Sequence, residues 1–402
     1  MKQNLKCVIF GDRHVIQDDD YLPETEKLIQ FLINKNIKVL ILSNDDDTEK
    51  DHRILLRDKL RQKYQQIDWY IADRNETIHK PKAEAVLSPL KQRDITASET
   101  IYIGNSDTDM KTAVNSKILF LNATWYGQQT DYGFQLETPK EIARFIDIFC
   151  LREHLWAYEI KDGDLEYYAL GIYGTREEKY DYSHDARETA KFGRGHPDFW
   201  IKYLLSAVYF SGLHERIDYI APYPGHKQGS TSVIEKDTII TFAKCFRKSY
   251  LSDLIERHTT SNKSAYARYN QQSLDHLNQL NTIKLNKYPI NQKVGKPYTN
   301  CPLKKDKTVL VIDDFCTQGY SLETSRLYIQ KTGAKVILLS LLKTICKDYE
   351  RIIQIENFLP FQNNYLNNSI QTKKYSFSKY LIDNNAHQEI RAKLKEYDNW
   401  NW

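Results

Sequence analysis

Two adjacent carboxylates, Asp313 and Asp314, follow an apolar stretch, Thr308–Ile312, and precede a short polar turn. The apolar and β-branched residues predict a strand that is buried on both faces and ends at the acids. The turn, 317–321, runs into a helical pattern from Leu322, and free amides at a helix N-terminus bind anions. The carboxylates would repel a phosphate bound directly beside them, but a phosphorylated ribose can bind both the acids and the turn. Its hydroxyls donate to the acids while its 5′-phosphate occupies the turn. The spacing therefore predicts a site for a phosphorylated ribose.

This stretch resembles the phosphoribosyl-pyrophosphate (PRPP) signature of type I phosphoribosyltransferases: an apolar strand, two acids and a T-T-G-x-[ST] loop. Gln318 replaces the second Thr of the signature, whereas Thr317, Gly319 and Ser321 match it. The resemblance implies that the two acids are catalytic and hold the ribose, and that the loop binds PRPP. The loop consists of Phe315, Cys316, Thr317, Gln318, Gly319, Tyr320 and Ser321. An ordinary βα unit with a capped helix is the structural alternative.

A second loop, 222–227, follows the predicted strand Ile217–Ile220. Its prolines and glycine predict a stiff turn with exposed amides beside a lysine, which suits pyrophosphate. The loop resembles the pyrophosphate loop of ComF-like phosphoribosyltransferases, which carry a P-x-P-x-H type turn here. Its residues are Pro222, Tyr223, Pro224, Gly225, His226 and Lys227. A plain strand-to-helix turn is the alternative.

Residues 257–300 are rich in Asn, Gln, Lys and Tyr. The resembling family has a flexible flap here that closes over PRPP, so we expect a flap over 258–300. The implied contacts to the diphosphate are Arg257, Lys263, Ser264 and Arg268. A disordered surface loop would have the same composition.

Four motifs in the first 150 residues resemble those of the haloacid dehalogenase-like hydrolases. They are Ile9–Ile16 at the nucleophile loop, Leu42–Asn44 at the phosphate-binding Ser/Thr, His79–Pro81 at the Lys motif and Ile103–Asp109 at the acidic magnesium loop. Within them, Ser43 and Lys80 form, together with Arg13, either a small cationic pocket or a solvated remnant of one.

The first and last of these motifs depart from the family. The family's nucleophile loop carries D-x-D, but Gly11 and Arg13 occupy those positions, and glycine cannot form an aspartyl-phosphate. Asn105 replaces the first acid of the magnesium loop, so that Asp109 alone clearly remains. The resemblance thus implies a degenerate hydrolase that acts as a scaffold or an anion-binding module. Activity through Asp12 would need a one-residue slip, which turns its side chain to the other face.

Strands alternate with helical segments throughout, which predicts an α/β protein with two mainly parallel sheets flanked by helices. We expect a Rossmann-like hydrolase domain over 1–150 and a phosphoribosyltransferase domain over 151–402. The second would carry a hood built from 151–195, from the C-terminal tail, or from both.

The composition excludes several classes of protein. Of 402 residues, 41% are hydrophobic and 27% charged, which is typical of a globular protein, and no apolar run reaches the length of a membrane span. The six cysteines are scattered, which indicates reduced thiols rather than a disulfide frame or zinc site. Residues 1–150 carry 21 Lys and Arg against 24 Asp and Glu, and the remainder 36 against 29, so the second part suits polyanionic ligands. With no signal peptide, the cytoplasm is the expected location.

These features predict transfer of a phosphoribosyl group from PRPP to a nucleobase or other nitrogen nucleophile, with release of pyrophosphate. Magnesium would be held mainly through PRPP, with no dedicated protein metal site. The alternative is a non-catalytic sensor of PRPP or a nucleotide, in a stress-response or phage-defence system. The sequence leaves open a partner protein, nucleic acid and a homo-oligomer.

Overall fold

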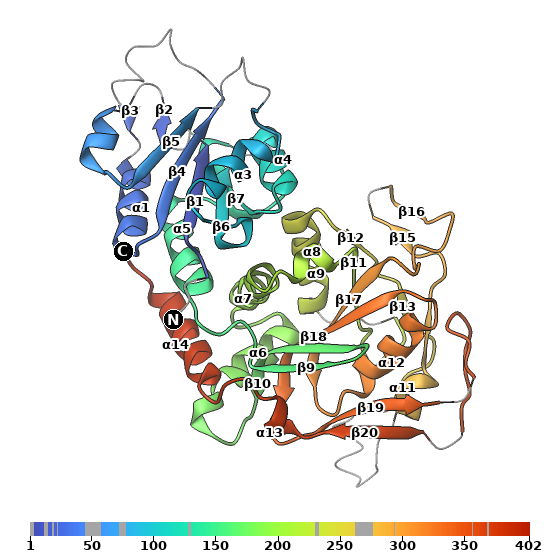
Figure 1. The fold of residues 1–402 in the computed structure, drawn as a ribbon. Coiled ribbons are helices and arrows are strands. Elements are labelled where there is room, and N and C mark those ends of the chain that lie inside the picture. The colour runs from blue at the N-terminus through green and yellow to red at the C-terminus, as the bar shows by residue number, and fades with distance from the viewer. Residues whose placement is uncertain are drawn as a thin grey trace.

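The computed structural model of the chain describes residues 4–11, 15–17, 20–21, 23–44, 58–71, 78–127, 130–229, 233–261, 276–292, 294–355, 357–367 and 370–402. Two six-stranded sheets dominate it, one at the upper left and one at the lower right of Figure 1, each with helices packed around it. The predicted α/β class with mainly parallel sheets is confirmed.

The first sheet has the strand order β5-β4-β1-β6-β7-β8, and all neighbouring strands are parallel. Its strands are β1 (Cys7–Gly11), β4 (Lys38–Ser43), β5 (Ile67–Ile71), β6 (Thr100–Gly104), β7 (Leu119–Ala123) and β8 (Phe134–Leu136). The helices are α1 (Pro23–Asn34), α3 (Glu84–Lys91), α4 (Asp107–Asn115) and α5 (Pro139–Phe145). Strand β1 is buried along its whole length, as expected of a strand with helices on both faces. The carboxyl ends of β1, β4 and β6 meet at one edge of the sheet.

The second sheet has the order β12-β11-β17-β18-β10-β9, with only the β9–β10 pair antiparallel. Its strands are β9 (Tyr158–Asp162), β10 (Leu165–Tyr173), β11 (Tyr219–Pro222), β12 (Ser249–Tyr250), β17 (Thr308–Cys316) and β18 (Lys335–Thr344). The accompanying helices are α6 (Tyr182–Phe192), α7 (Pro197–Phe210), α8 (Leu213–Arg216), α9 (Val233–Phe246) and α12 (Tyr320–Gln330).

Strand β17 is longer than the sequence predicts. Its pairing with β18 continues through Asp313, opposite Ser340, to Cys316, opposite Lys343, so the acids lie within the strand rather than after it. Helix α12 begins at Tyr320 rather than Leu322, because Gly319 forms its N-cap at a φ of 87°.

The second half of the predicted flap over 258–300 contains regular elements with buried residues. Residues 276–300 contain helix α11 (Leu277–Leu280), strand β14 (Ile283–Leu285), which pairs with β13 (Ile255–Arg257), and the ribbon β15 (Ile290–Asn291) and β16 (Lys296–Pro297). Leu280 and Ile283 are fully buried, and the Leu280 carbonyl accepts a hydrogen bond of 2.6 Å from Tyr328 of α12. The sequence does not indicate this packing, because the few apolar residues stand in a segment of polar composition.

The C-terminal segment divides into two parts. The ribbon β19 (Tyr349–Gln354) and β20 (Gln371–Tyr375) lies beside α12, followed by the short helix α13 (Phe377–Tyr380). Helix α14 (Ala386–Asn399) then runs back to the first sheet (Figure 1). There the Trp400 indole donates to Asp147 at 2.9 Å and meets Phe31 edge-on, so the tail joins the two halves as well as reaching the second sheet.

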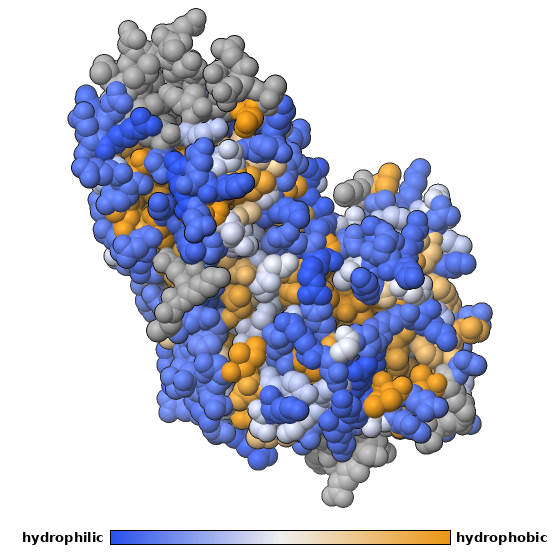
Figure 2. All heavy atoms as spheres, viewed as in Figure 1, coloured by the Kyte–Doolittle hydropathy of each residue, from blue (hydrophilic) through white to orange (hydrophobic). Residues whose placement is uncertain are grey.

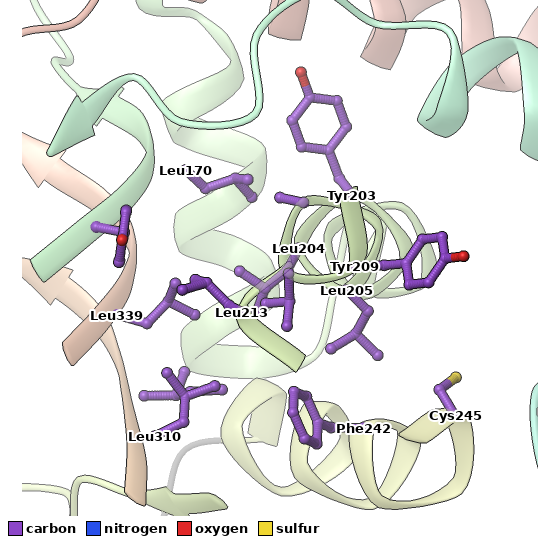
Figure 3. Packing of buried hydrophobic residues seen from close by; sticks show 14 of the residues in the cluster. Leu170, Tyr203, Leu204, Leu205, Tyr209, Leu213, Phe242, Cys245, Leu310 and Leu339 are labelled. Carbon is purple, nitrogen blue, oxygen red and sulfur yellow. The ribbon is translucent and has the colours of Figure 1, made fainter. Parts of the chain in front are cut away.

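One continuous apolar core runs through both halves, and a smaller cluster fills the other face of the first sheet. Figure 3 shows Leu204 and Leu213 of α7 and α8, with Phe242 of α9, gathered around Leu310 and Leu339 of the second sheet. Hydrophilic residues cover most of the face drawn in Figure 2. Among the described residues, no helix is both long and apolar enough to cross a membrane. Minor elements are β2 (Ile16–Gln17), β3 (Asp20–Tyr21), a π-helical turn (Ile146–Cys150) and three short 3-10 helices (Ala97–Glu99, Thr124–Tyr126, Glu178–Tyr180).

Candidate functional site

The two predicted ligand loops of the second sheet lie side by side. Strands β11 and β17 are parallel neighbours, with Pro222 opposite Ile312, and the Tyr223 amide donates to the Ile312 carbonyl at 2.8 Å. Both strands therefore deliver their following residues to the same edge of the sheet, where ligands bind in open α/β sheets. The loop 222–227 thus lies next to the acids and the turn at 313–321.

The two acids are held by the local backbone. Asp313 accepts the Asp314 amide at 2.9 Å, and Asp314 accepts the Phe315 amide at 2.7 Å. Asp313 is buried and Asp314 half-buried. Burial raises the pKa of Asp314, although the hydrogen bonds to Asp313 and Phe315 and the charge of Lys191 partly oppose this. A desolvated acid pair of this kind binds donors such as ribose hydroxyls strongly.

Tyr223 connects the two loops. Its hydroxyl donates to Gln279 at 2.7 Å. Burial raises its pKa to about 12, and the charge of Arg257, the nearby Asp313 carboxylate and a hydrogen bond with Ser321 also act on it. Tyr223 of the first loop therefore interacts with Asp313 through charge and with Ser321 through a hydrogen bond.

Arg257 supports the 222–227 loop. Only 5% of the residue is exposed, and its guanidinium donates to the Gly225 carbonyl, to Thr282 at 2.6 Å and to Gln279 at 3.0 Å. A longer contact of 3.4 Å reaches the Pro224 carbonyl. Because its donors already fix the loop, the contact of Arg257 with a diphosphate stays a prediction.

Three contacts hold the 315–321 turn. The hydroxyls of Thr317 and Thr344 are 3.1 Å apart, and Gln318 donates to Glu350 of β19 at 3.0 Å. The Tyr349 ring packs against Gly319, where an added Cβ would lie 2.3 Å from the nearest ring atom. Gly319 is therefore required both by its positive φ and by this ring. Gln318, which replaces the second Thr of the PRPP signature, therefore has a hydrogen-bond partner in Glu350.

A buried lysine, Lys343, lies under the same turn. Its ammonium donates to the carbonyls of Thr317 and Lys347 and lies 5.5 Å from the Tyr158 ring centroid. Burial lowers its pKa. The ammonium thus fixes the backbone of the turn from the protein side.

The remaining predicted residues of this region take separate places. The Cys316 thiol is buried with its pKa raised to about 11 by burial, and Phe315 packs edge-on against Tyr173. Lys227 is exposed, while His226 is half-buried and its carbonyl accepts the Ser261 amide at 3.0 Å. The predicted contacts Lys263, Ser264 and Arg268 lie outside the described residues.

At the first sheet, Asp109 is enclosed by donors. Lys80 donates to its Oδ1 at 3.0 Å and Tyr102 to the same oxygen at 2.8 Å, while Ser106 donates to Oδ2 at 2.7 Å. Ser106 is also the N-cap of α4, because its hydroxyl accepts the Asp109 amide at 3.0 Å. The structure thus brings the Lys motif and the acidic loop together.

The other motif residues surround this pair. Gly11 ends β1 so close to Asp109 that an added Cβ would lie 3.2 Å from Oδ2. The Asn44 side chain accepts a hydrogen bond from the Lys80 amide at 2.8 Å and donates one to the Lys80 carbonyl at 3.1 Å. Ser43 is buried. Asn105 donates to the Gly127 carbonyl at 3.2 Å. The predicted Arg13, like Asp12, lies outside the described residues.

The described residues do not fit the magnesium ion of the hydrolase motifs. Magnesium prefers several carboxylate and water oxygens in an octahedron. Two acids of these motifs lie among the described residues. Asp107 is exposed and pairs with Lys111, and Asp109 is already bound by an ammonium, a phenol and a hydroxyl. No cluster of three or more His, Cys, Asp or Glu side chains that could hold a metal occurs in the described part of the chain.

Several supporting residues carry no sequence signal. Tyr102 looks like an ordinary strand residue, and Gln279, Glu350 and Lys343 lie far in sequence from the loops they hold. Only the fold brings them there.

Comparison with known proteins concerns the first sheet. Residues 10–123 match the haloacid dehalogenase-like hydrolase family. One similar solved structure, a protein from Lactobacillus delbrueckii subsp. bulgaricus assigned as a phosphoglycolate phosphatase, shares 18% identity over 31% of this chain and 53% of its own, with a TM-score of 0.27. A haloacid dehalogenase-superfamily hydrolase from Ehrlichia chaffeensis shares 21% identity over 32% and 58%, with a TM-score of 0.25.

A third structure, D,D-heptose 1,7-bisphosphate phosphatase from B. bronchiseptica complexed with magnesium and phosphate, shares 15% identity over 35% of this chain and 96% of its own, with a TM-score of 0.29. The chain spans little more than half the length of the first two structures. No curated protein matches the chain. The N-terminal region of this protein is therefore a haloacid dehalogenase-like hydrolase domain.

Proposed function

We propose that the protein is a phosphoribosyltransferase. Its second sheet binds PRPP with magnesium and transfers the phosphoribosyl group to a nucleobase or another nitrogen nucleophile, with release of pyrophosphate. The observation that carries this proposal is the adjacency of the 222–227 and 313–321 loops at the ends of β11 and β17. The Tyr223 amide of the first loop also donates to the Ile312 carbonyl, next to Asp313, at 2.8 Å.

The reacting groups of PRPP match this arrangement in order. The 5′-phosphate would occupy the 315–321 turn at the start of α12, a helix whose N-cap, Gly319, provides no side-chain hydrogen bond, so its first amides and dipole are available. The ribose hydroxyls would donate to Asp313 and Asp314, and the diphosphate would lie against 222–227. An adjacent acid pair stabilises the positive charge that develops at the anomeric carbon.

The supporting residues keep both loops in place before PRPP binds. Arg257 fixes 222–227, and Lys343 fixes the backbone at Thr317. Such preorganisation lowers the barrier because little of the site must reorder in the reaction. Magnesium, carried by the PRPP oxygens, would neutralise charge on the departing diphosphate.

The hydrolase-like domain would have a regulatory or structural role. Members of this family are hydrolases, but here Gly11 lacks the nucleophilic carboxylate and Asp109 is bound by Lys80, Tyr102 and Ser106. We place the domain boundary near residue 150. The proposed ligands are PRPP and a nucleobase-like molecule, and the proposed location is the cytoplasm.

Pyrophosphate release tests the proposal. The full chain is incubated with PRPP, magnesium and a panel of purine and pyrimidine bases, and pyrophosphate is measured with a coupled assay. We expect base-dependent release that the Asp313→Asn/Asp314→Asn variant lacks. Tight PRPP binding without release for any base would favour a non-catalytic sensor instead, and absence of both would refute the assignment.

A further inference from the structure

A cavity of about 300 Å³ opens where the two halves of the protein meet, and none of the candidate site residues lines it. Its walls come from Asp131 and Tyr132 of the first half, from residues 240–250 and from Asn291 and Gln292. Helix α9, which supplies much of one wall, packs against β11 and also against β7 and β8 of the first sheet. In Figure 1, α9 lies on the side of the second sheet that faces the first.

Three cations line this cavity: Lys244, Arg247 and Lys248. Within the part of the chain that the structure describes, no carboxylate forms an ion pair with any of them. Asp131 is the only acid among the described residues that line the cavity. The described part of the lining therefore has an excess of positive charge, on Lys244 and Arg247, which are exposed, and on Lys248, which is half-buried; such an excess attracts anions.

The carboxylates near Lys248 are paired with other lysines and so do not neutralise the charge of the Lys248 ammonium. Burial lowers its pKa, and the carboxylates that act on it are Asp218 and Glu215. Asp218 is already paired with Lys307 at 3.1 Å, and Glu215 with Lys117 at 2.8 Å. A half-buried ammonium that lacks its own counter-ion is poised for an anionic ligand.

Arg247 is held in a backbone conformation that arginine rarely adopts. It follows the last residue of α9, Phe246, with a φ of 49°, where glycine is strongly preferred. Its guanidinium lies 5.1 Å from the ring centroid of Tyr132 in the opposite wall. Lys244 lies in the last turn of α9, where a cation stabilises the helix dipole. The dipole does not, however, require an arginine at position 247.

We propose that this cavity binds a small organic phosphate with a planar ring, of the nucleoside phosphate class. The phosphate would pair with the three cations, the ring would stack against Tyr132 or Tyr250, and the side-chain amides of Asn291 and Gln292 would bind its polar edge. Because the walls come from both halves, the ligand would couple the hydrolase-like domain to the second sheet. The site is separate from the proposed PRPP site and does not depend on that assignment.

Calorimetry tests this proposal with AMP, adenosine and inorganic phosphate as probes. AMP could also enter the PRPP site, so all titrations use the full chain carrying Asp313→Asn/Asp314→Asn. AMP should bind at least tenfold more tightly than adenosine or phosphate alone. Adding Lys244→Gln/Lys248→Gln should weaken AMP binding at least tenfold, whereas the charge-matched Lys305→Gln/Lys335→Gln control at exposed positions should leave it within twofold.

A second variant separates binding from folding. Arg247→Gly relieves the positive φ, so it should raise the midpoint of thermal unfolding while weakening AMP at least fivefold. The proposal is overturned if AMP does not bind, or if the Lys244→Gln/Lys248→Gln protein binds AMP as well as its control does. Neither result would bear on pyrophosphate release by the wild type, so failure here is distinct from failure of the proposed transferase.

Discussion

The carboxylate of Asp109 fills the space beside Gly11, where a Cβ atom would lie 3.2 Å from Oδ2 and 3.3 Å from Oδ1. The glycine at position 11 and the enclosed acid are therefore two parts of one arrangement. Lys80, Tyr102 and Ser106 hold the carboxylate there through hydrogen bonds.

Gly11→Asp alone should therefore not restore phosphatase activity. The new carboxylate would meet Asp109 in a buried place, and we expect the free energy of unfolding to fall by about 1–3 kcal/mol. Magnesium-dependent hydrolysis of a generic aryl phosphate, measured for the wild type and the variant, checks this. Hydrolysis by the wild type that Asp12→Asn abolishes would show that the nucleophile is at position 12 instead.

Gly319→Ala should be far more destabilising than Gly212→Ala. The two glycines are N-caps with similar dihedral angles, φ 87° and ψ 6° against φ 75° and ψ 3°. An added Cβ at Gly212 meets nothing within 4 Å, whereas at Gly319 it would overlap the Tyr349 ring. We expect an additional loss of about 2 kcal/mol or more in urea unfolding for the first variant. Equal losses would mean that the ring does not constrain the turn.

Arg257→Met should lower both stability and PRPP affinity. The change leaves the Gly225 carbonyl, Thr282 and Gln279 without their donor, which should cost about 2–3 kcal/mol of unfolding free energy. PRPP should bind more weakly because 222–227 loses its support. Arg187→Met, at an exposed arginine of α6, is the control and should change neither quantity. Normal stability of the Arg257 variant would refute its supporting role.

The sequence predicts the two mainly parallel sheets because they depend on local patterns. Apolar runs mark β1, β10 and β18, and the loops at 222–227 and 313–321 follow strands whose order makes them neighbours. The sequence does not predict features that depend on long-range packing. Strand β17 continues past Ile312 because β18 pairs with it, and Arg257 is buried where it donates a hydrogen bond to Thr282. The buried residues of 276–285 are too few to outweigh a polar composition.

Two histidines join the C-terminal segment to the second half. His154 lies between Asp383 at 2.9 Å and Glu389 at 3.0 Å, and His196 between Asp185 at 2.6 Å and Asp398 at 3.0 Å. Burial alone would lower the pKa of each histidine, but the hydrogen bonds and charges of its two carboxylates outweigh burial and raise it. Protonated imidazoles therefore stabilise the docked segment.

Replacing both histidines, as His154→Gln/His196→Gln, should cost most stability at low pH. A histidine whose pKa is raised on folding contributes fully below its unfolded pKa of about 6.5, and the contribution is lost as pH rises through the folded pKa. The difference in unfolding free energy from the wild type should thus shrink from pH 6 to pH 9. His184→Gln, at an exposed histidine, serves as the control. A difference that grows with pH would contradict the assignment.

Calorimetric titration of PRPP with magnesium tests the central claim most directly. Asp313→Asn/Asp314→Asn removes the charged acceptors for the ribose, so binding should weaken by about 2–4 kcal/mol. Asp94→Asn/Asp306→Asn makes the same charge change at two exposed residues and should leave the affinity unchanged. We expect the wild type and the Asp94→Asn/Asp306→Asn control to bind PRPP with equal affinity, and the Asp313→Asn/Asp314→Asn variant to bind it more weakly. Equal affinity of the wild type and both variants would contradict the account, and so would a wild type that does not bind PRPP.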